Sequence, residues 1–97
     1  MRVLFAPDAL RELRDHLTYV RERNPEAARN QRRILFAAID QLETLPHIGR
    51  PGRVPGTREL VITGTPYLAV YEVTARAVRV LHIHHGRQNW AGDTGVE

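Results

Sequence analysis

The stretch from Tyr67 to Trp90, YLAVYEVTARAVRVLHIHHGRQNW, constrains the fold more than any other part of the chain. It is typical of two β-strands, Tyr67–Val73 and Val78–His85, joined by a short turn, because aromatic and β-branched residues dominate both segments. Such residues suit a pleated surface that is half buried. The stretch also contains three of the five histidines and the single tryptophan, so it is a candidate functional surface.

The first half of the chain predicts two helices joined by a tight corner. Pro7 fits the first position of a helix, and apolar residues follow it at spacings of three and four until about Arg23. Asn24-Pro25-Glu26 then supplies a capping side chain, a proline and an acid for a second helix, which Pro46 stops. Seven side chains of this second helix are expected to face the core: Ala27, Gln31, Ile34, Leu35, Ala38, Leu42 and Leu45.

The remaining segments complete an α+β fold. Arg2–Phe5 reads as an edge strand, His47–Thr57 as a loop with three glycines and two prolines, and Arg58–Ile62 as a further strand. We therefore expect an N-terminal strand, a helical hairpin, and a three-stranded antiparallel meander with the helices on one face. The other face is then free. Residues 1–90 form a single domain, and residues 91–97 form a polar tail.

Every basic residue of the chain is an arginine, and fourteen arginines stand against eleven acidic residues. A guanidinium group binds phosphate or carboxylate as a planar fork, which an ammonium group cannot do. The formal net charge is +3, and between residues 47 and 90 six arginines are accompanied by only two glutamates. This local excess of positive charge favours an anionic partner.

Composition excludes several classes of protein. The chain has no cysteine, so it has neither a disulfide framework nor thiolate chemistry. No apolar run is long enough for a signal peptide or a membrane span, and we expect a cytoplasmic protein without a membrane partner. Because nucleophile-elbow, phosphate-loop, dinucleotide-binding and zinc-finger patterns are also absent, we expect no cofactor.

The histidines are the first candidates for chemistry. In a strand, His82 and His84 point to one face and His85 points to the other. The pair could bind a metal ion, but a metal site needs further ligands and the sequence offers no obvious one, so we expect no metal. Histidine also titrates near neutral pH and could act as an acid or base. For any single one of the three, ordinary packing is the commoner role.

Arginines and aromatic residues supply the remaining candidates. Arg58, Arg79 and Arg87 would form a basic patch if all of them faced the open side of the sheet, which depends on the strand register. Tyr67 and Tyr71 share a face of their strand, where they either pack in the core or stack on nucleic-acid bases. Trp90 is expected to close one end of the core rather than to contact a ligand.

The order of elements, together with GTREL, PYLAVYEV and VRVLHIHHGRQNW, resembles the RelE/ParE superfamily of toxins from bacterial type II toxin–antitoxin systems. The first helix at residues 9–13, the NPEAA corner and the GRPG loop are also similar to that family, and the resemblance covers residues 2–90. It implies a cognate antitoxin that wraps the toxin along its groove and its sheet. It also implies a complex that represses its own operon, with the antitoxin contacting the operator DNA.

The resemblance implies two alternative targets. RelE-like members cut mRNA in the ribosome, whereas ParE-like members poison DNA gyrase. Leu68 stands where RelE-like ribonucleases typically carry an arginine, and the closing helix with its tyrosine is missing. These departures favour a ParE-like gyrase poison. If the chain is instead a ribonuclease, its expected catalytic residues are Arg58, His85 and Arg87. A third alternative is an inactive homologue that acts only as a co-repressor.

Ten residues are the candidates for contact with the target or the antitoxin. They are Arg50, Arg53, Arg58, Tyr67, Tyr71, Arg79, His82, His84, Arg87 and Trp90.

Overall fold

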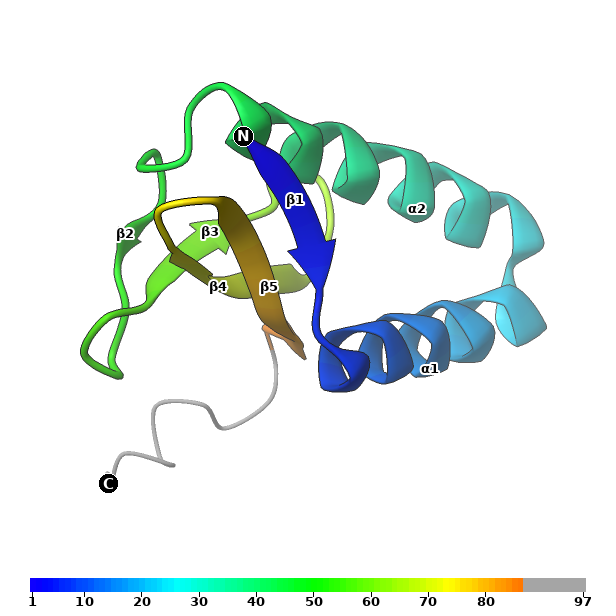
Figure 1. The fold of residues 1–97 in the computed structure, drawn as a ribbon. Helices are drawn as coiled ribbons and strands as arrows, with labels where there is room; N and C mark the ends of the chain where they lie inside the picture. The colour runs from blue at the N-terminus through cyan, green and yellow to red at the C-terminus, as the bar shows by residue number, and fades with distance from the viewer. Residues whose placement is uncertain (87–97) are drawn as a thin grey trace.

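Two helices form a hairpin that covers one face of a five-stranded sheet in the computed structural model, which describes residues 1–86 (Figure 1). The predicted α+β architecture is confirmed. The elements in chain order are β1 (Arg2–Phe5), α1 (Pro7–Arg23), α2 (Pro25–Asp40), a 3₁₀ turn (Gln41–Glu43), β2 (Arg50–Pro51), β3 (Arg58–Val61), β4 (Tyr67–Val73) and β5 (Ala77–His85).

One residue, Asn24, ends α1 and begins α2. Its backbone N–H donates to the carbonyl of Val20 at 2.7 Å, and its side-chain oxygen accepts from the N–H of Ala27 at 3.1 Å. Prolines occupy the start of both helices, where a missing N–H costs nothing. The corner of the hairpin therefore lies where the capping pattern predicts it.

The strands are ordered β1-β5-β4-β3-β2 across the sheet. β1 is parallel to β5, while all other pairs are antiparallel. The prediction of a loop before β3 is wrong at two residues, because Arg50 and Pro51 pair with Glu59 and Arg58 as a short extra strand. The antiparallel meander is thus one strand longer than expected.

The strand register decides which side chains the helices cover. Tyr67, Ala69 and Tyr71 of β4 belong to the buried core cluster, together with Leu35 of α2 and Ile83 of β5. The alternate residues of β4 face the opposite side of the sheet, which we call the open face. A register shift lies between Val70 and Tyr71, opposite His82 and Val80. This β-bulge lets residues on both sides of it in β5 point into the same core.

The end of α2 differs from the expectation. The helix stops at Asp40 and a 3₁₀ turn follows, which has three residues per turn instead of 3.6. Leu42 keeps its place in the core at 0% exposure, but Leu45 lies beyond the turn and is 54% exposed. Leu45 is therefore a surface residue and not a core residue. No helix within residues 1–86 is long and apolar enough to cross a membrane.

Candidate functional site

A buried carboxylate anchors the loop that lies over the open face. Glu59 of β3 is 2% exposed, and its Oε1 accepts from Nε and Nη2 of Arg50 at 3.2 and 3.1 Å. Its Oε2 accepts from the backbone N–H of Arg53 at 3.1 Å. The backbone of Arg50 is held by its pairing with Glu59 in the sheet and the backbone of Arg53 by this hydrogen bond, so both arginines start from fixed backbone positions.

The same contacts keep Glu59 ionised. Burial by itself would raise the pKa of this carboxyl group. The hydrogen bond from the Arg53 amide, the hydrogen bond from Arg50 and the charges of both arginines outweigh the burial, so the pKa lies below its ordinary value of 4.5. Glu59 is thus a negative charge inside the protein that is balanced by a partly exposed guanidinium group.

A pocket of about 370 Å³ opens beside this anchor, where the start of β4 and the end of β5 meet the β2–β3 loop. Its walls combine positive, aromatic and apolar groups. Six of the residues that line it are Arg50, Arg53, Val61, Leu68, His84 and His85. The structure therefore brings five of the predicted site residues to one place: Arg50, Arg53, Tyr67, His84 and His85. Leu68 forms part of the same wall.

Helix α1 holds the free edge of β5 just beyond the end of β1. Glu12 accepts from the backbone N–H of Ile83 at 2.9 Å through Oε1, and its Oε2 lies 3.2 Å from Nδ1 of His82. His16 places Nε2 at 3.0 Å from the carbonyl of Ile83. Since a carbonyl only accepts, this contact requires the proton of His16 to be on Nε2.

The predicted histidines divide between the two faces as expected. His82 and His84 stack on the open face with ring centroids 5.2 Å apart. His85 lies on the covered side, with its ring centroid 6.0 Å from those of both His16 and Tyr67. The described residues contain no group of three or more histidine, aspartate or glutamate side chains that could hold a metal ion.

The three-arginine patch is not assembled by the described residues. Arg58 pairs in register with Tyr71 and therefore points away from the open face. Its Nη1 donates to the carbonyls of Gly49 and His47 at 2.7 and 3.2 Å. Arg79 lies on the open face, and its Nη1 is 2.7 Å from Oε2 of Glu72. Arg87 and Trp90 lie outside the described residues.

Both candidate tyrosines are core residues. Tyr67 is 2% exposed and stacks on His16 with ring centroids 5.4 Å apart. Its hydroxyl donates to Oε1 of Gln31 at 2.7 Å. Tyr71 is 0% exposed and donates to the carbonyl of Pro46 at 2.8 Å. Burial raises the pKa of both hydroxyl groups. The structure thus places these side chains in the interior, where their rings are not available for stacking on bases.

Sequence reasoning missed three polar residues of this region. Glu12 and His16 are four apart, a spacing that puts both on one side of α1, so helical periodicity could have paired them. Glu59 gives no such signal, because a charged residue in a strand is usually exposed. Only the register, which places Glu59 opposite Arg50, reveals its role.

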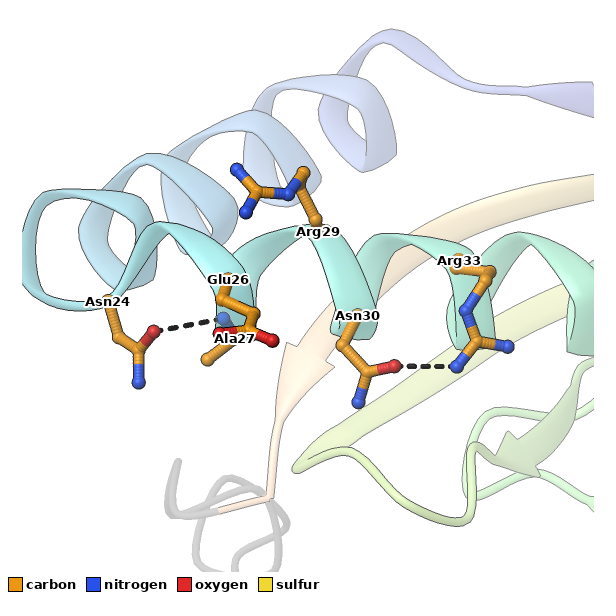
Figure 2. A pocket seen from close by; sticks show the side chains of 6 residues that line it. All are labelled: Asn24, Glu26, Ala27, Arg29, Asn30 and Arg33. Atoms are coloured by element: carbon orange, nitrogen blue, oxygen red, sulfur yellow. Dashed lines mark hydrogen bonds between the residues drawn. The ribbon is translucent and has the colours of Figure 1, made fainter.

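Two further depressions lie on the helical hairpin. Figure 2 shows the first, at the start of α2, lined by Asn24, Glu26, Ala27, Arg29, Asn30 and Arg33. Its dashed lines mark hydrogen bonds that stay within α2 and its cap, so these contacts explain local helix geometry. The second depression is a groove of about 500 Å³ between α1 and α2. Apolar side chains and four arginines line it, including Leu10, Leu17, Phe36, Arg14, Arg21, Arg29 and Arg32.

A helical hairpin on one face of a small mixed sheet, with Arg79, His82 and His84 on the other, is the arrangement of a RelE/ParE-type toxin fold. The family model for the ParE toxin of type II toxin–antitoxin systems, parDE, matches residues 3–90, and the chain belongs to this family.

Two comparisons agree with this membership. The chain is 36% identical over 89 residues to "Putative toxin Y4kP" of Sinorhizobium fredii, a match that covers 92% of each chain. Its fold is similar to a structure described as the chromosomal ParDE TA system from P. aeruginosa, with a TM-score of 0.72 and 23% identity. That match covers 88% of this chain and 95% of the other.

Proposed function

We propose that this toxin poisons DNA gyrase and is neutralised by a cognate antitoxin in the cytoplasm, with operator DNA bound through the antitoxin. The observation that carries the gyrase assignment is that three arginines are already bound to acceptors within the protein. Arg50 is bound to Glu59, Arg79 to Glu72, and Arg58 to two backbone carbonyls. Cleavage of a phosphodiester requires cations aimed at the scissile phosphate in addition to an acid and a base. Such an array is not formed by these three side chains.

Leu68 supports the same proposal. It lies on the open face at 9% exposure, beside Val61 of the neighbouring strand. An apolar residue at this position can pack against a protein surface, but it cannot neutralise a developing negative charge. The non-enzymatic action of a protein that binds and traps gyrase fits this surface better than hydrolysis.

A gyrase assay tests the proposal directly. Purified toxin, added in excess to the gyrase tetramer with relaxed plasmid, is expected to block supercoiling and to leave linear DNA after protein removal. Primer extension on translated messages is expected to show no new ends after induction. A lack of any effect on gyrase at high excess would rule the assignment out.

A specific observation favours ribosome-dependent mRNA cleavage as the second candidate. The 3.2 Å contact between Glu12 and Nδ1 of His82 would orient an imidazole on the open face, as a general acid or base requires. If this candidate is right, induction gives discrete cuts in translated mRNA, and His82→Gln or His85→Gln removes them while Arg76→Gln, in the β4–β5 turn, does not. Intact messages would eliminate the candidate.

The groove between α1 and α2 is the proposed antitoxin surface. Its apolar floor and four surrounding arginines suit an amphipathic helix with acidic flanks. Leu10 belongs to this groove and is 51% exposed, so it offers apolar surface to a partner helix. The inactive co-repressor alternative shares this surface, and growth arrest on induction separates it from an active toxin.

A further inference from the structure

We propose that the pocket at the end of β4 and β5 is a recognition site for a carboxylate side chain of a protein partner. The proposal deepens the proposed function, because it names the surface through which the toxin would hold its target and the chemistry of the group it takes. The lining of the pocket shares no residue with the groove between the helices.

The positive wall of the pocket is held in place before any ligand binds. Two nitrogens of Arg50 are bound to the buried Glu59, yet the Arg50 side chain is 56% exposed. A guanidinium group carries five N–H donors, so Arg50 retains donors for a second acceptor. Arg53 lines the same pocket, and its backbone is fixed by Glu59. Because the geometry is set in advance, binding loses less conformational freedom.

Part of the same lining is apolar. Val61 and Leu68 are cross-strand partners, and Val61 is 56% exposed. Both line the pocket with the arginines. A free phosphate, which is hydrated on every side, gains nothing from two aliphatic side chains. A carboxylate side chain of a polypeptide has aliphatic neighbours, and these can cover Val61 and Leu68. Burying this apolar surface adds to the binding energy.

Nucleic acid fits the pocket less well. Single-stranded recognition relies on aromatic faces on which bases stack. Among the lining residues that the structure describes, Tyr67 is the only tyrosine, phenylalanine or tryptophan, and it is 2% exposed with its ring stacked on His16. The described lining thus offers charge, two histidine rings and aliphatic surface to a partner, a combination found at protein interfaces.

Nuclear magnetic resonance of the whole ¹⁵N-labelled chain tests the assignment. The probes are the peptide acetyl-Leu-Asp-Leu-amide, its Asn analogue, and inorganic phosphate. We expect the Asp peptide to shift the amide signals of Arg50, Arg53 and His84, with affinity on the order of millimolar. The Asn analogue and phosphate are expected to bind at least about tenfold more weakly, because one lacks the charge and the other lacks the aliphatic contacts.

Two variants and a matched control define the site. Arg53→Gln keeps the backbone N–H that Glu59 needs, and should weaken the Asp peptide about tenfold through loss of a charged donor. Val61→Glu places a negative charge at an exposed position of the pocket and should abolish binding. Arg76→Gln removes an exposed arginine from the far end of the β4–β5 hairpin and should change nothing.

Each outcome decides the proposal. Equal binding of the Asn analogue, stronger binding of phosphate, or signal shifts located elsewhere on the protein would overturn it. The gyrase assay separates it from the proposed function. If Val61→Glu blocks supercoiling as well as the wild type does, the pocket is not the target contact and the gyrase assignment stands. If the wild type leaves gyrase unaffected but binds the Asp peptide, the gyrase assignment fails and the carboxylate site remains.

Discussion

Glu59 combines a negative charge with almost complete burial, and donors from a single loop make that combination stable. A carboxyl group whose pKa is lowered by folding binds fewer protons in the folded state than in the unfolded state. Its stabilisation is therefore complete above the unfolded pKa and is lost as the pH falls through the folded pKa. Glu59 makes the loop over the open face sensitive to acid.

The first prediction concerns this residue. Glu59→Gln should lower the free energy of unfolding near neutral pH by about 1–3 kcal/mol. Arg50 loses a charged acceptor, and the buried side chain at position 59 loses hydrogen-bond donors. The difference from the wild type should begin to shrink as the pH falls through the ordinary pKa of 4.5, where the unfolded carboxyl group takes up a proton, and should be smallest below the lowered pKa of the folded protein, where the folded group is protonated as well. Urea unfolding of both proteins across acid pH measures it. Glu72→Gln is the matched control, because its ion pair is partly exposed and should cost at most about 1 kcal/mol.

The second prediction concerns the tight contact beneath the same loop. A Cβ at Gly49 would lie 2.7 Å from the Tyr71 hydroxyl oxygen and 2.9 Å from the carbonyl oxygen of Glu59. Gly49→Ala should therefore displace the loop and reduce stability by about 1–3 kcal/mol. Thermal unfolding compares it with Ala75→Gly, an exposed change in the β4–β5 turn. A melting temperature for Gly49→Ala equal to that of the wild type would contradict the packing described for Tyr71.

Individual residues also mark where sequence reasoning stops. Pro7, Asn24 and Pro25 predict the helix ends correctly, because capping depends on local chemistry alone. The role of Glu59 depends on its partner across β2, and the direction of Arg58 depends on its register with Tyr71. Both are set by tertiary pairing, and one sequence does not fix that register.

At the scale of elements, β1 and α1 share the task of covering the edge of β5. β1 pairs with β5 only as far as Val80, and beyond that point Glu12 and His16 bind the backbone of Ile83. An uncovered edge invites pairing with another chain. Two side chains of a helix therefore substitute for the missing length of strand. The sequence predicts both elements, but not that one completes the other.

The third prediction follows from this edge. Glu12→Ala should leave the N–H of Ile83 without its acceptor, so its hydrogen exchange should accelerate by at least about tenfold, since a charged hydrogen bond is lost. Asp15→Ala, an exposed change on the same helix, should leave that exchange unchanged. The variant is also expected to self-associate more readily, which sedimentation velocity measures. Unaltered exchange at Ile83 would show that α1 does not guard this edge.

At the scale of the whole molecule, the fold separates the surface proposed for the antitoxin from the surface proposed for the target. The groove between α1 and α2 and the pocket at the end of β4 and β5 have no lining residue in common. The α+β class and the helical hairpin could be predicted from periodicity and turn chemistry. The composition of each surface could not, because it depends on which residues a bulge, a two-residue strand and a 3₁₀ turn bring outward.

This separation leads to the last prediction, that neutralisation and toxicity can be uncoupled by a single change. Leu10→Glu puts a negative charge into an apolar groove at a position that is 51% exposed, so the fold should be retained. The variant should still arrest growth, but the cognate antitoxin should no longer protect cells, because an acidic helix would meet a like charge. Val54→Glu, at a similarly exposed position (54%) in the β2–β3 loop, is the control and should remain neutralised.

Co-purification from cells that express both proteins measures this directly, with growth as the second readout. We expect that only Leu10→Glu loses the complex and that it still arrests growth. This result would mean that the antitoxin depends on the helical groove and that the target is reached through another surface. If the antitoxin still binds and protects against Leu10→Glu, the groove is not its principal contact. If growth arrest disappears for a folded Leu10→Glu protein, the two surfaces are not independent, and the helical face must take part in poisoning as well.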